Sequence, residues 1–336
     1  MYRPPVLFLL LTAIGINAVA AEVNIYSARK EALIKPILEE FTVETGITVN
    51  LVTGGADELI KRLELEGRNS PADLLLTVDV GRLYRAKQAD LLQPVHSETL
   101  SEVIPDHYRD PEDYWYGLSL RSRVIVYAKD RVDAADLSTY EALADPQWRN
   151  RICVRSSSNI YNQSLVASMV AHQGVEATEQ WARGLVKNFA RRPKGGDRDQ
   201  IKAVAVGQCD LALVNTYYLA GMLESDIPAE RQAAEKVAVF WPNQDGRGAH
   251  VNISGAGVTR AAQHTEEALR LLEFLAGKEA QSWYAEKNYE FPVRDDVPPS
   301  ELLRQWGGFR ADDIELEQLG IHNAEAVRLM DRAGWK

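Results

Sequence analysis

VNIYSARKEALIKPILEEFTVETGITVNLVTGG, residues 23–55, predicts a strand, a helix and a second strand in immediate succession. VNIYS is typical of a short strand, and ITVNLVTGG of another strand that ends in glycines. Between them, apolar residues recur at helical spacing until Gly46 ends the helix; they are Leu33, Ile34, Ile37, Leu38 and Phe41. Units of this kind, when repeated, form a parallel sheet covered by helices, so the first part of the chain is predicted to be α/β.

The alternation of helix and strand continues beyond this stretch. DELIKRLELEG (57–67) is an amphipathic helix and ADLLLTV (72–78) a buried strand. A long alternating strand follows in YGLSLRSRVIVYAKD (116–130), long enough to cross from one lobe to another, and the helix and strand pattern then resumes. HVNISGAGVT (250–259) resembles a strand that returns to the first lobe. Two α/β lobes joined by extended crossovers indicate a hinged binding protein that closes on a ligand.

The chain termini and composition set the compartment and the size of the protein. Residues 1–21 have Arg3, an apolar stretch and small residues before Ala21, which predicts a cleaved signal peptide, because the apolar run is too short for a membrane span. About 315 residues then remain, enough for two domains. The net charge of -10 argues against nucleic acid or an anionic membrane as a partner.

Two cysteines, Cys153 and Cys209, are the only ones in the chain. In an oxidising compartment they form either one disulfide or two buried free thiols. Each begins a run typical of a strand, ICVRSS and CDLALVN, and two such strands lying side by side favour the disulfide.

Enzyme chemistry finds little support in the sequence. The six histidines are scattered, without an HExxH motif, and neither a GxSxG elbow nor a phosphate-binding loop is present. Arg121 and Arg123 lie on one face of the long strand, since alternate residues share a face. They serve either in ion pairs or as a clamp for a carboxylate or carbonate.

Three tyrosines lie where strands are expected to end. Tyr161 lies in SSSNIYNQSL (156–165), and Tyr217 and Tyr218 follow the buried strand of CDLALVNTYYLAGML (209–223). Strand ends are where ligands bind in open α/β sheets, although packing is the commoner role of such a tyrosine pair. Three phenolates suit a hard, highly charged cation such as Fe(III), whereas zinc or copper recruits His or Cys.

The chain resembles the periplasmic ferric-iron-binding proteins of ABC importers, the class that includes the cyanobacterial iron-uptake binding proteins. The resemblance covers essentially the whole mature length, and it rests on NIYSARKEALIKPILEEFTVETGI, SPADLLLTVDVGRL, YGLSLRSRVIVY, RICVRSSSNIYNQSLVASMVA, GQCDLALVNTYYLAGM and HVNISGAGVT. It implies a type II clamshell of two lobes, each a mixed sheet flanked by helices. It also implies Fe(III) held by tyrosinates, with carbonate or citrate as an accompanying anion. We place the lobes at residues 22–123 with 247–297, and 124–246 with 298–336.

Carried over residue by residue, the resemblance assigns Tyr161, Tyr217 and Tyr218 as iron ligands. An arginine of the pair Arg121 and Arg123 takes the anion, and we prefer Arg121.

The first lobe departs from the pattern of the family. Lys30 and Glu31 replace the His-Tyr pair of many relatives, and Val78, beside Asp79, replaces the glutamate of others. Glu31 is then the candidate carboxylate ligand and Lys30 a candidate anion contact, with water or carbonate filling the remaining positions.

Three further residues near the expected cleft receive structural roles. Tyr26, at the end of the first strand, is predicted to pack. His250 and Asn252 lie in the returning crossover and are predicted to hold the hinge through backbone hydrogen bonds.

The function that the resemblance implies is capture of Fe(III) in the periplasm and delivery to a cognate ABC permease and its ATPase, by a monomeric protein that is not an enzyme. An importer protein that binds citrate, phosphate or another anion through Arg121 and Arg123 is the alternative. A secreted metal-dependent hydrolase is the third hypothesis, and the scattered histidines disfavour it.

Overall fold

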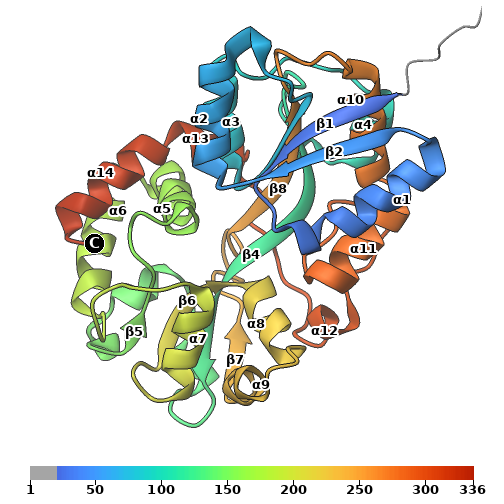
Figure 1. Cartoon of the computed structure of the whole chain (residues 1–336). Coiled ribbons are helices and arrows are strands. Elements are labelled where there is room, and N and C mark those ends of the chain that lie inside the picture. Colours follow the sequence, from blue (N-terminus) through green and yellow to red (C-terminus); the bar gives the residue numbers. More distant parts are fainter. Residues whose placement is uncertain (1–20) are drawn as a thin grey trace, which may run out of the picture.

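The computed structural model describes residues 21–336, so the predicted signal peptide lies outside the described residues apart from Ala21. Eight strands form a curled sheet in the order β2-β1-β3-β8-β4-β6-β5, with β7 paired to β4 (Figure 1). The strands are β1 (Glu22–Ser27), β2 (Thr48–Thr53), β3 (Leu74–Val78), β4 (Tyr116–Ala128), β5 (Ile152–Cys153), β6 (Leu211–Asn215), β7 (Val237–Phe240) and β8 (Val251–Val258).

Strand β4 belongs to two parts of the sheet. Residues 116–122 pair with β8, which in turn pairs with β3, and residues 123–127 pair with β6, with β7 on the other side. We call β1, β2, β3, β8 and the start of β4 the N-terminal half, and the end of β4 with β5, β6 and β7 the C-terminal half. Figure 1 shows β4 and β8 running between them. The long strand therefore runs from one half of the sheet into the other, as its length predicted.

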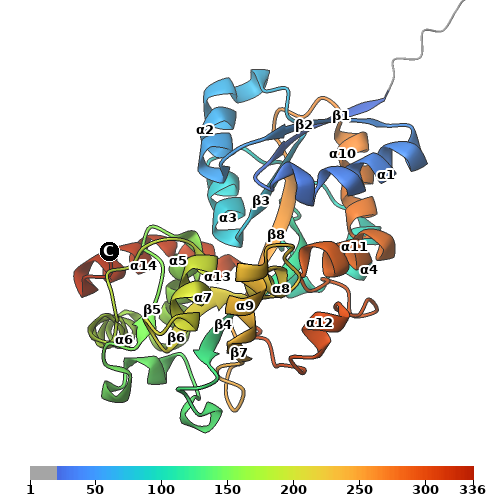
Figure 2. The ribbon, with the colours of Figure 1, turned by 60° about the horizontal axis from the view of Figure 1, so that its bottom comes forward.

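Helices cover both halves of the sheet (Figure 2). They are α1 (Lys35–Thr45), α2 (Ala56–Glu66), α3 (Val80–Gln88), α4 (Glu98–Val103), α5 (Ile160–Gln173), α6 (Val175–Lys187), α7 (Asp197–Ala205), α8 (Thr216–Leu223), α9 (Pro228–Glu235), α10 (Thr265–Leu275), α11 (Lys278–Asn288), α12 (Glu301–Arg304), α13 (Glu317–Ile321) and α14 (Asn323–Ala333). The predicted α/β clamshell with a mixed sheet is confirmed.

The first helix begins later than its apolar pattern predicts. A 3-10 turn occupies Glu31–Leu33, and α1 starts at Lys35, with Pro36 in its first turn. Proline has no backbone N–H to donate and its ring crowds the preceding turn, so it fits only at a helix start. Leu33 is consequently 38% exposed instead of buried with the helix. The helix ends at Gly46, whose φ of 73° gives the left-handed cap that glycine adopts without strain.

Each half has its own apolar core. Ile25, Phe41 and Leu271 belong to the core of the N-terminal half, and Leu165 and Leu213 to one of the two clusters in the C-terminal half. Burial of such side chains, at about 25 cal/mol per Å² of apolar area, drives the formation of each half.

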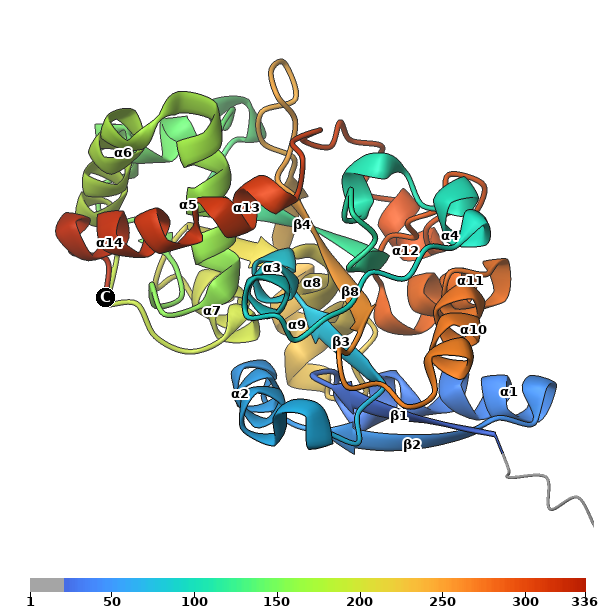
Figure 3. The ribbon, with the colours of Figure 1, turned by 90° about the horizontal axis from the view of Figure 1, so that it is seen from above.

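The last segment of the chain contacts both halves. Leu316 and Leu319 pack into the N-terminal core, whereas Leu329 and Met330 pack into the C-terminal one. Between them α13 contacts both α3 and α5, which Figure 3 shows from above. The C-terminus is thus a third connection between the halves, beside β4 and β8.

Cys153 and Cys209 form a disulfide with a Cα–Cα distance of 5.8 Å. Strands β5 and β6 run parallel there, with Cys153 opposite Ala212, as the strand-like runs suggested. Among residues 21–336, no helix combines the length and the apolar character that a membrane span needs.

Candidate metal centre

Tyr217 and Tyr218 occupy the first turn of α8, directly after the buried strand β6. Their ring centroids lie 4.3 Å apart, at an interplanar angle of 38°. Packing would place one ring in the core and the other at the rim, but both rings are half-buried and line the same cleft. The strand-to-helix turn therefore presents two phenols at one point.

Tyr161 reaches the same point from the first turn of α5. The Tyr217 hydroxyl donates a hydrogen bond to the Tyr161 hydroxyl over 3.2 Å, and the Asn215 side-chain amide lies 3.5 Å from the Tyr217 oxygen. The three tyrosines belong to the first turns of α5 and α8, and the positive end of a helix dipole favours a nearby negative charge. Two helix starts thus bring three phenols together.

The tyrosines line a cleft of about 370 Å³ to which both halves contribute. The C-terminal wall consists of Tyr161, Arg198, Tyr217, Tyr218 and Gly221. The N-terminal wall consists of Ala28, Arg29, Lys30, Leu33, Val78, Lys287, Asn288, Tyr289 and Glu290. A ligand held in this cleft would contact both halves of the molecule.

Their surroundings keep the phenols of Tyr217 and Tyr218 in the neutral form. Burial raises the pKa of Tyr217 well above its usual value, and the neighbouring Tyr161 and Tyr218 raise it further. Burial and Tyr161 likewise raise the pKa of Tyr218. Without a cation these phenols stay protonated at neutral pH, so binding to their oxygens requires a metal charged strongly enough to displace the protons.

Arg121 lies beside the ring of Tyr217. Its guanidinium carbon is 5.9 Å from the Tyr217 ring centroid, and its Nη2 donates to Glu290 Oε1 over 3.0 Å and to Ser254. Its Nε and Nη1 are buried and have no hydrogen-bond partner in the described part of the chain. Burial acts to lower the pKa of Arg121, but Glu290 and Tyr217 raise it overall, so the side chain remains a cation with donors to spare.

Arg123 has a different environment from Arg121. Its guanidinium donates to Asn215 Oδ1 over 2.9 Å, to Asn162 Oδ1 over 2.6 Å and to the Leu213 carbonyl over 3.1 Å. Asn162 adjoins Tyr161, and Asn215 is the N-cap residue of α8. Arg123 therefore fixes the two helix starts relative to each other. Neither arginine is among the residues that line the cleft, and both are almost fully buried.

Glu31 is not brought to the tyrosines. Its carboxylate pairs with Lys35 over 2.8 Å, and both side chains are more than half exposed. Together they line a separate hollow against α1 and β2, whereas Lys30 lines the tyrosine cleft. The 3-10 turn explains the difference, because it directs Glu31 along α1 toward the residue four positions ahead. The arrangement gives no support to Glu31 as a metal ligand.

Val78 lines the cleft, but Asp79 does not. The Asp79 carboxylate is buried and accepts hydrogen bonds from the Ser164 hydroxyl over 2.8 Å and from the Gly81 amide over 3.0 Å. It caps α3 and joins it to α5. The position that carries a glutamate in other proteins of the resembled family is therefore apolar here.

The other tyrosine and crossover residues fit the structural roles predicted for them. The Tyr26 hydroxyl donates to Glu66 over 2.9 Å, away from the cleft. Asn252 Oδ1 accepts from the Val80 amide over 2.9 Å, and the His250 carbonyl accepts from the Arg123 amide over 3.0 Å. These contacts tie the crossing strands to their neighbours.

Arg29 and Glu290 were missed by the sequence reasoning. Arg29 Nη2 donates to Glu290 and, over 2.9 Å, to Ser119, and Glu290 also pairs with Arg121. The two residues are 261 positions apart, so no local motif links them. Tyr289, with a left-handed φ of 54°, turns the chain after α11 and places Glu290 toward the arginines.

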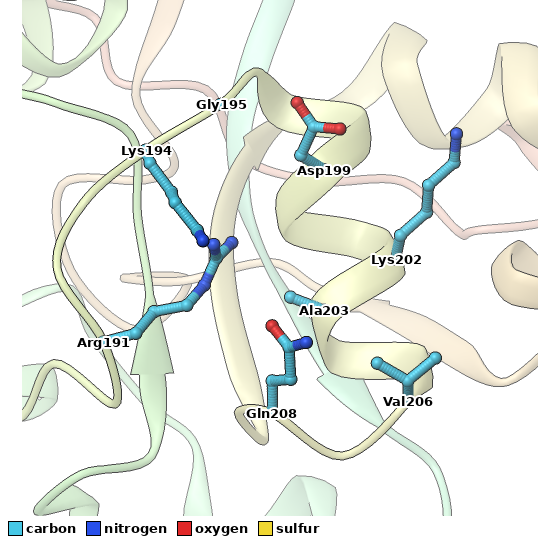
Figure 4. A pocket seen from close by; sticks show the side chains of 8 residues that line it. All are labelled: Arg191, Lys194, Gly195, Asp199, Lys202, Ala203, Val206 and Gln208. Carbon is cyan, nitrogen blue, oxygen red and sulfur yellow. The ribbon is translucent and has the colours of Figure 1, made fainter.

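A second cavity, of about 350 Å³, lies beside α7 and contains no phenol (Figure 4). Arg191, Lys194, Asp199, Lys202 and Gln208 line it. Asp199 accepts from the Gly196 amide over 2.7 Å and so caps α7. Across residues 21–336, no group of three or more His, Cys, Asp or Glu side chains is arranged to hold a metal ion. The tyrosine cleft is therefore our candidate metal centre.

Comparison with known proteins gives consistent matches over nearly the whole chain. The family described as bacterial extracellular solute-binding protein matches residues 69–307. Iron uptake protein A1 of Synechocystis sp. is 50% identical over 315 residues, which are 94% of this chain and 88% of that protein. The Fe(3+)-binding periplasmic protein of Serratia marcescens is 30% identical, over 97% of this chain and 94% of that protein.

Solved structures agree with these matches. Trichodesmium FutA (IdiA), in complex with iron and citrate ligands, superposes with a TM-score of 0.92 at 48% identity, covering 94% of this chain and 100% of that one. Apo FutA2 of Synechocystis superposes with a TM-score of 0.90 at 46% identity, with coverages of 94% and 100%. The chain belongs to the bacterial extracellular solute-binding proteins, a family of binding proteins and not of enzymes, and within it to the ferric-iron-binding class.

Proposed function

We propose that this protein binds Fe(III) in the cleft between its halves, with the phenolates of Tyr161, Tyr217 and Tyr218 as ligands. The observation that carries the proposal is the convergence of three phenols from two helix starts, with two of the hydroxyls 3.2 Å apart. A phenol ordinarily titrates at about pH 10, so only a strongly polarising cation binds it as phenolate near neutrality. Relatives named as an iron uptake protein and as an Fe(3+)-binding periplasmic protein support iron as that cation.

Arg121 is the contact that we propose for an accompanying anion such as carbonate or citrate. Its buried Nε and Nη1 have no partner in the described part of the chain, and they lie beside the tyrosines. A guanidinium binds a carboxylate or carbonate through two parallel hydrogen bonds. The anion would supply oxygen ligands to iron while it satisfies these donors. Arg123 is the weaker candidate, because both of its terminal nitrogens already donate to Asn162, Asn215 and Leu213, and only its Nε has no partner in the described part of the chain.

The iron would be delivered to a cognate ABC permease driven by its ATPase. We propose that the chain acts in the periplasm as a monomer, after cleavage of its signal peptide near residue 21. The lobes would consist of residues 22–123 with 247–297, and 124–246 with 298–336. Closure would bring the N-terminal wall against iron held on the C-terminal wall, and opening at the permease would release it.

A visible spectrum during titration with ferric citrate tests the proposal. Phenolate bound to Fe(III) absorbs visible light, so the wild-type protein should acquire a charge-transfer band. A variant with Tyr217→Phe and Tyr218→Phe should lose the band while keeping its far-ultraviolet circular dichroism. A band of unchanged intensity in that folded variant would contradict the assignment of these ligands.

A function in anion binding alone is the second candidate, and the spare donors of Arg121 favour it. It predicts calorimetric binding of citrate or phosphate in the absence of iron, with an affinity that Phe at positions 217 and 218 does not change. Iron-dependent binding of the same anions would instead assign the arginine to the iron site.

A further inference from the structure

We infer that the cargo enters as an intact ferric complex of a polycarboxylate, and that Lys30 and Lys287 form a second anion subsite on the N-terminal wall. This inference rests on the proposed function, since it presumes iron on the three phenols. Some carboxylates of the chelator do not bind iron, and we assign these to the two lysines. The subsite lies across the cleft from the tyrosines and is separate from the contact with Arg121.

The charge of the cleft is the first argument. Its lining contains four basic side chains, Arg29, Lys30, Arg198 and Lys287, and one carboxylate, Glu290, which gives a net charge of +3. The whole chain, by contrast, has a net charge of -10. Three phenolates would neutralise Fe(III), so the positive charge of the walls remains for the cargo to balance. A chelator with two or three free negative charges matches that excess.

Of the four basic side chains, the two arginines are already paired with carboxylates and the two lysines are not. Arg29 is bound to Glu290, and Arg198 donates to Glu230 over 2.7 Å. Lys30 and Lys287 have neither an ion pair nor a side-chain hydrogen bond within residues 21–336. A lysine is a compact charge on a flexible stem, which suits a carboxylate whose position varies. These two are therefore the cations of the cleft that are available to a ligand.

Contacts between the two chain segments place the lysines on one wall. Lys30 precedes the 3-10 turn, and Lys287 lies in the last turn of α11. The Asn288 side-chain amide donates to the Leu33 carbonyl over 3.1 Å and so fixes the end of α11 against that turn. The subsite thus combines two segments that are far apart in the sequence.

The shortage of protein ligands on the N-terminal wall is the second argument. Iron with three phenolates has about three coordination positions left. Glu290, the one carboxylate that lines the cleft, has Oε1 on Arg121 and Oε2 on Arg29 and Ser119. Glu31 faces a different hollow. Asn288 and Tyr289 are the other side chains of this wall that carry an oxygen and line the cleft. A hydroxypolycarboxylate would supply several oxygens at once, in place of water or carbonate, together with the negative charge that the lysines match.

Retention of radiolabelled citrate provides the test. Wild-type protein loaded with ferric [14C]citrate and desalted should keep about one citrate per iron. A variant with Lys30→Gln and Lys287→Gln should lose most of the label and bind ferric citrate about tenfold more weakly, because two charge pairs of this kind are worth about a decade. The matched control is Lys187→Gln with Lys236→Gln, which removes the same charge from exposed lysines outside the cleft and should behave as wild type.

The outcomes separate this inference from the proposed function. A phenolate band without retained citrate in wild type, or equal citrate retention in the cleft variant and its control, would overturn the lysine subsite and leave iron binding intact. A missing band in wild type would overturn the proposed function itself. High salt should weaken binding of ferric citrate to wild type more than to the cleft variant, since the partly exposed charges are screened.

Discussion

The two walls of the cleft have opposite chemistry. The C-terminal wall carries the three phenols on the first turns of α5 and α8, held in place by Arg123 through Asn162 and Asn215. The N-terminal wall carries the cations Arg29, Lys30 and Lys287, the single phenol of Tyr289, and Glu290, whose carboxylate is occupied by Arg29 and Arg121. The three proposed ligands therefore lie on one wall and most of the positive charge on the other.

This difference indicates an order of events in binding. All three proposed ligands belong to one half, so iron can bind there before the halves close. Closure then adds the positive charge of the N-terminal wall instead of further ligands, which strengthens the hold on an anionic complex but not on a bare cation. The predictions below test this division, beginning with the largest effect.

Acidification should weaken iron binding steeply. The pKa values of Tyr217 and Tyr218 are raised by burial, so iron must displace their protons, and protonation at lower pH competes with iron. With three phenols, the apparent affinity should fall by up to about three decades per pH unit. Competition with a chelator of known protonation, repeated across a pH series, measures this slope. A slope near zero would mean that the C-terminal wall does not bind through phenolates.

Removal of a single phenol should lower the affinity for iron by less than acidification does, but still substantially. Tyr161→Phe should weaken iron binding by at least about a hundredfold, which is the upper range for loss of a group that merely supports a ligand. The charge-transfer band should weaken as well. Tyr26→Phe is the matched control, because the Tyr26 hydroxyl binds Glu66 outside the cleft. Equal affinities of the two variants would remove Tyr161 from the ligand set.

Replacement of the two arginines should separate their roles. Arg121→Lys should weaken the dependence of iron binding on bicarbonate, with a loss of about tenfold in affinity, because lysine cannot form the paired hydrogen bonds of a guanidinium. Arg123→Lys should instead lower the melting temperature, since Asn162 and Asn215 lose donors. Spectroscopic titration with and without bicarbonate distinguishes them. Loss of the bicarbonate dependence in Arg123→Lys alone would reverse the assignment.

The C-terminal wall was predictable because its information is local. Tyr217 and Tyr218 directly follow β6, and Tyr161 opens the first helix after β5, so all three lie beyond strand ends, where such a sheet places side chains at the cleft. The crossover role of β4 was equally visible, since a strand of 13 residues is longer than one lobe requires.

The N-terminal wall was predictable only in part, because tertiary packing assembles it: Lys30 was expected there, but Arg29, Lys287 and Glu290 were not. Lys30 and Lys287 come from segments that meet only through the contact of Asn288 with Leu33. Glu31 was expected at the cleft, but Pro36 delays the helix, and the resulting 3-10 turn gives that place to Lys30. The C-terminal segment packs against both cores, and the pattern of apolar residues in the sequence did not predict this either.

The smallest effect that we predict is on the pH dependence of stability, and it arises in the strands that join the two walls. His250, just before β8, is buried, and burial, with the charges of Arg123 and Arg247, lowers its pKa to about 3. Below about pH 6.5 the His250 imidazole binds a proton in the unfolded chain but not in the folded protein. The contribution of neutral His250 to the free energy of unfolding is therefore complete above that pH and is lost as the pH falls toward 3.

Between about pH 7.5 and pH 5, this histidine alone should lower the free energy of unfolding by about 2 kcal/mol. Urea titrations of wild type and His250→Gln at both pH values measure the contribution, because every other group titrates alike in the two proteins. The variant should therefore lose about 2 kcal/mol less than wild type on acidification. Equal losses would show that His250 becomes protonated within the folded crossover, and acid would then act on the connection between the walls without unfolding the protein.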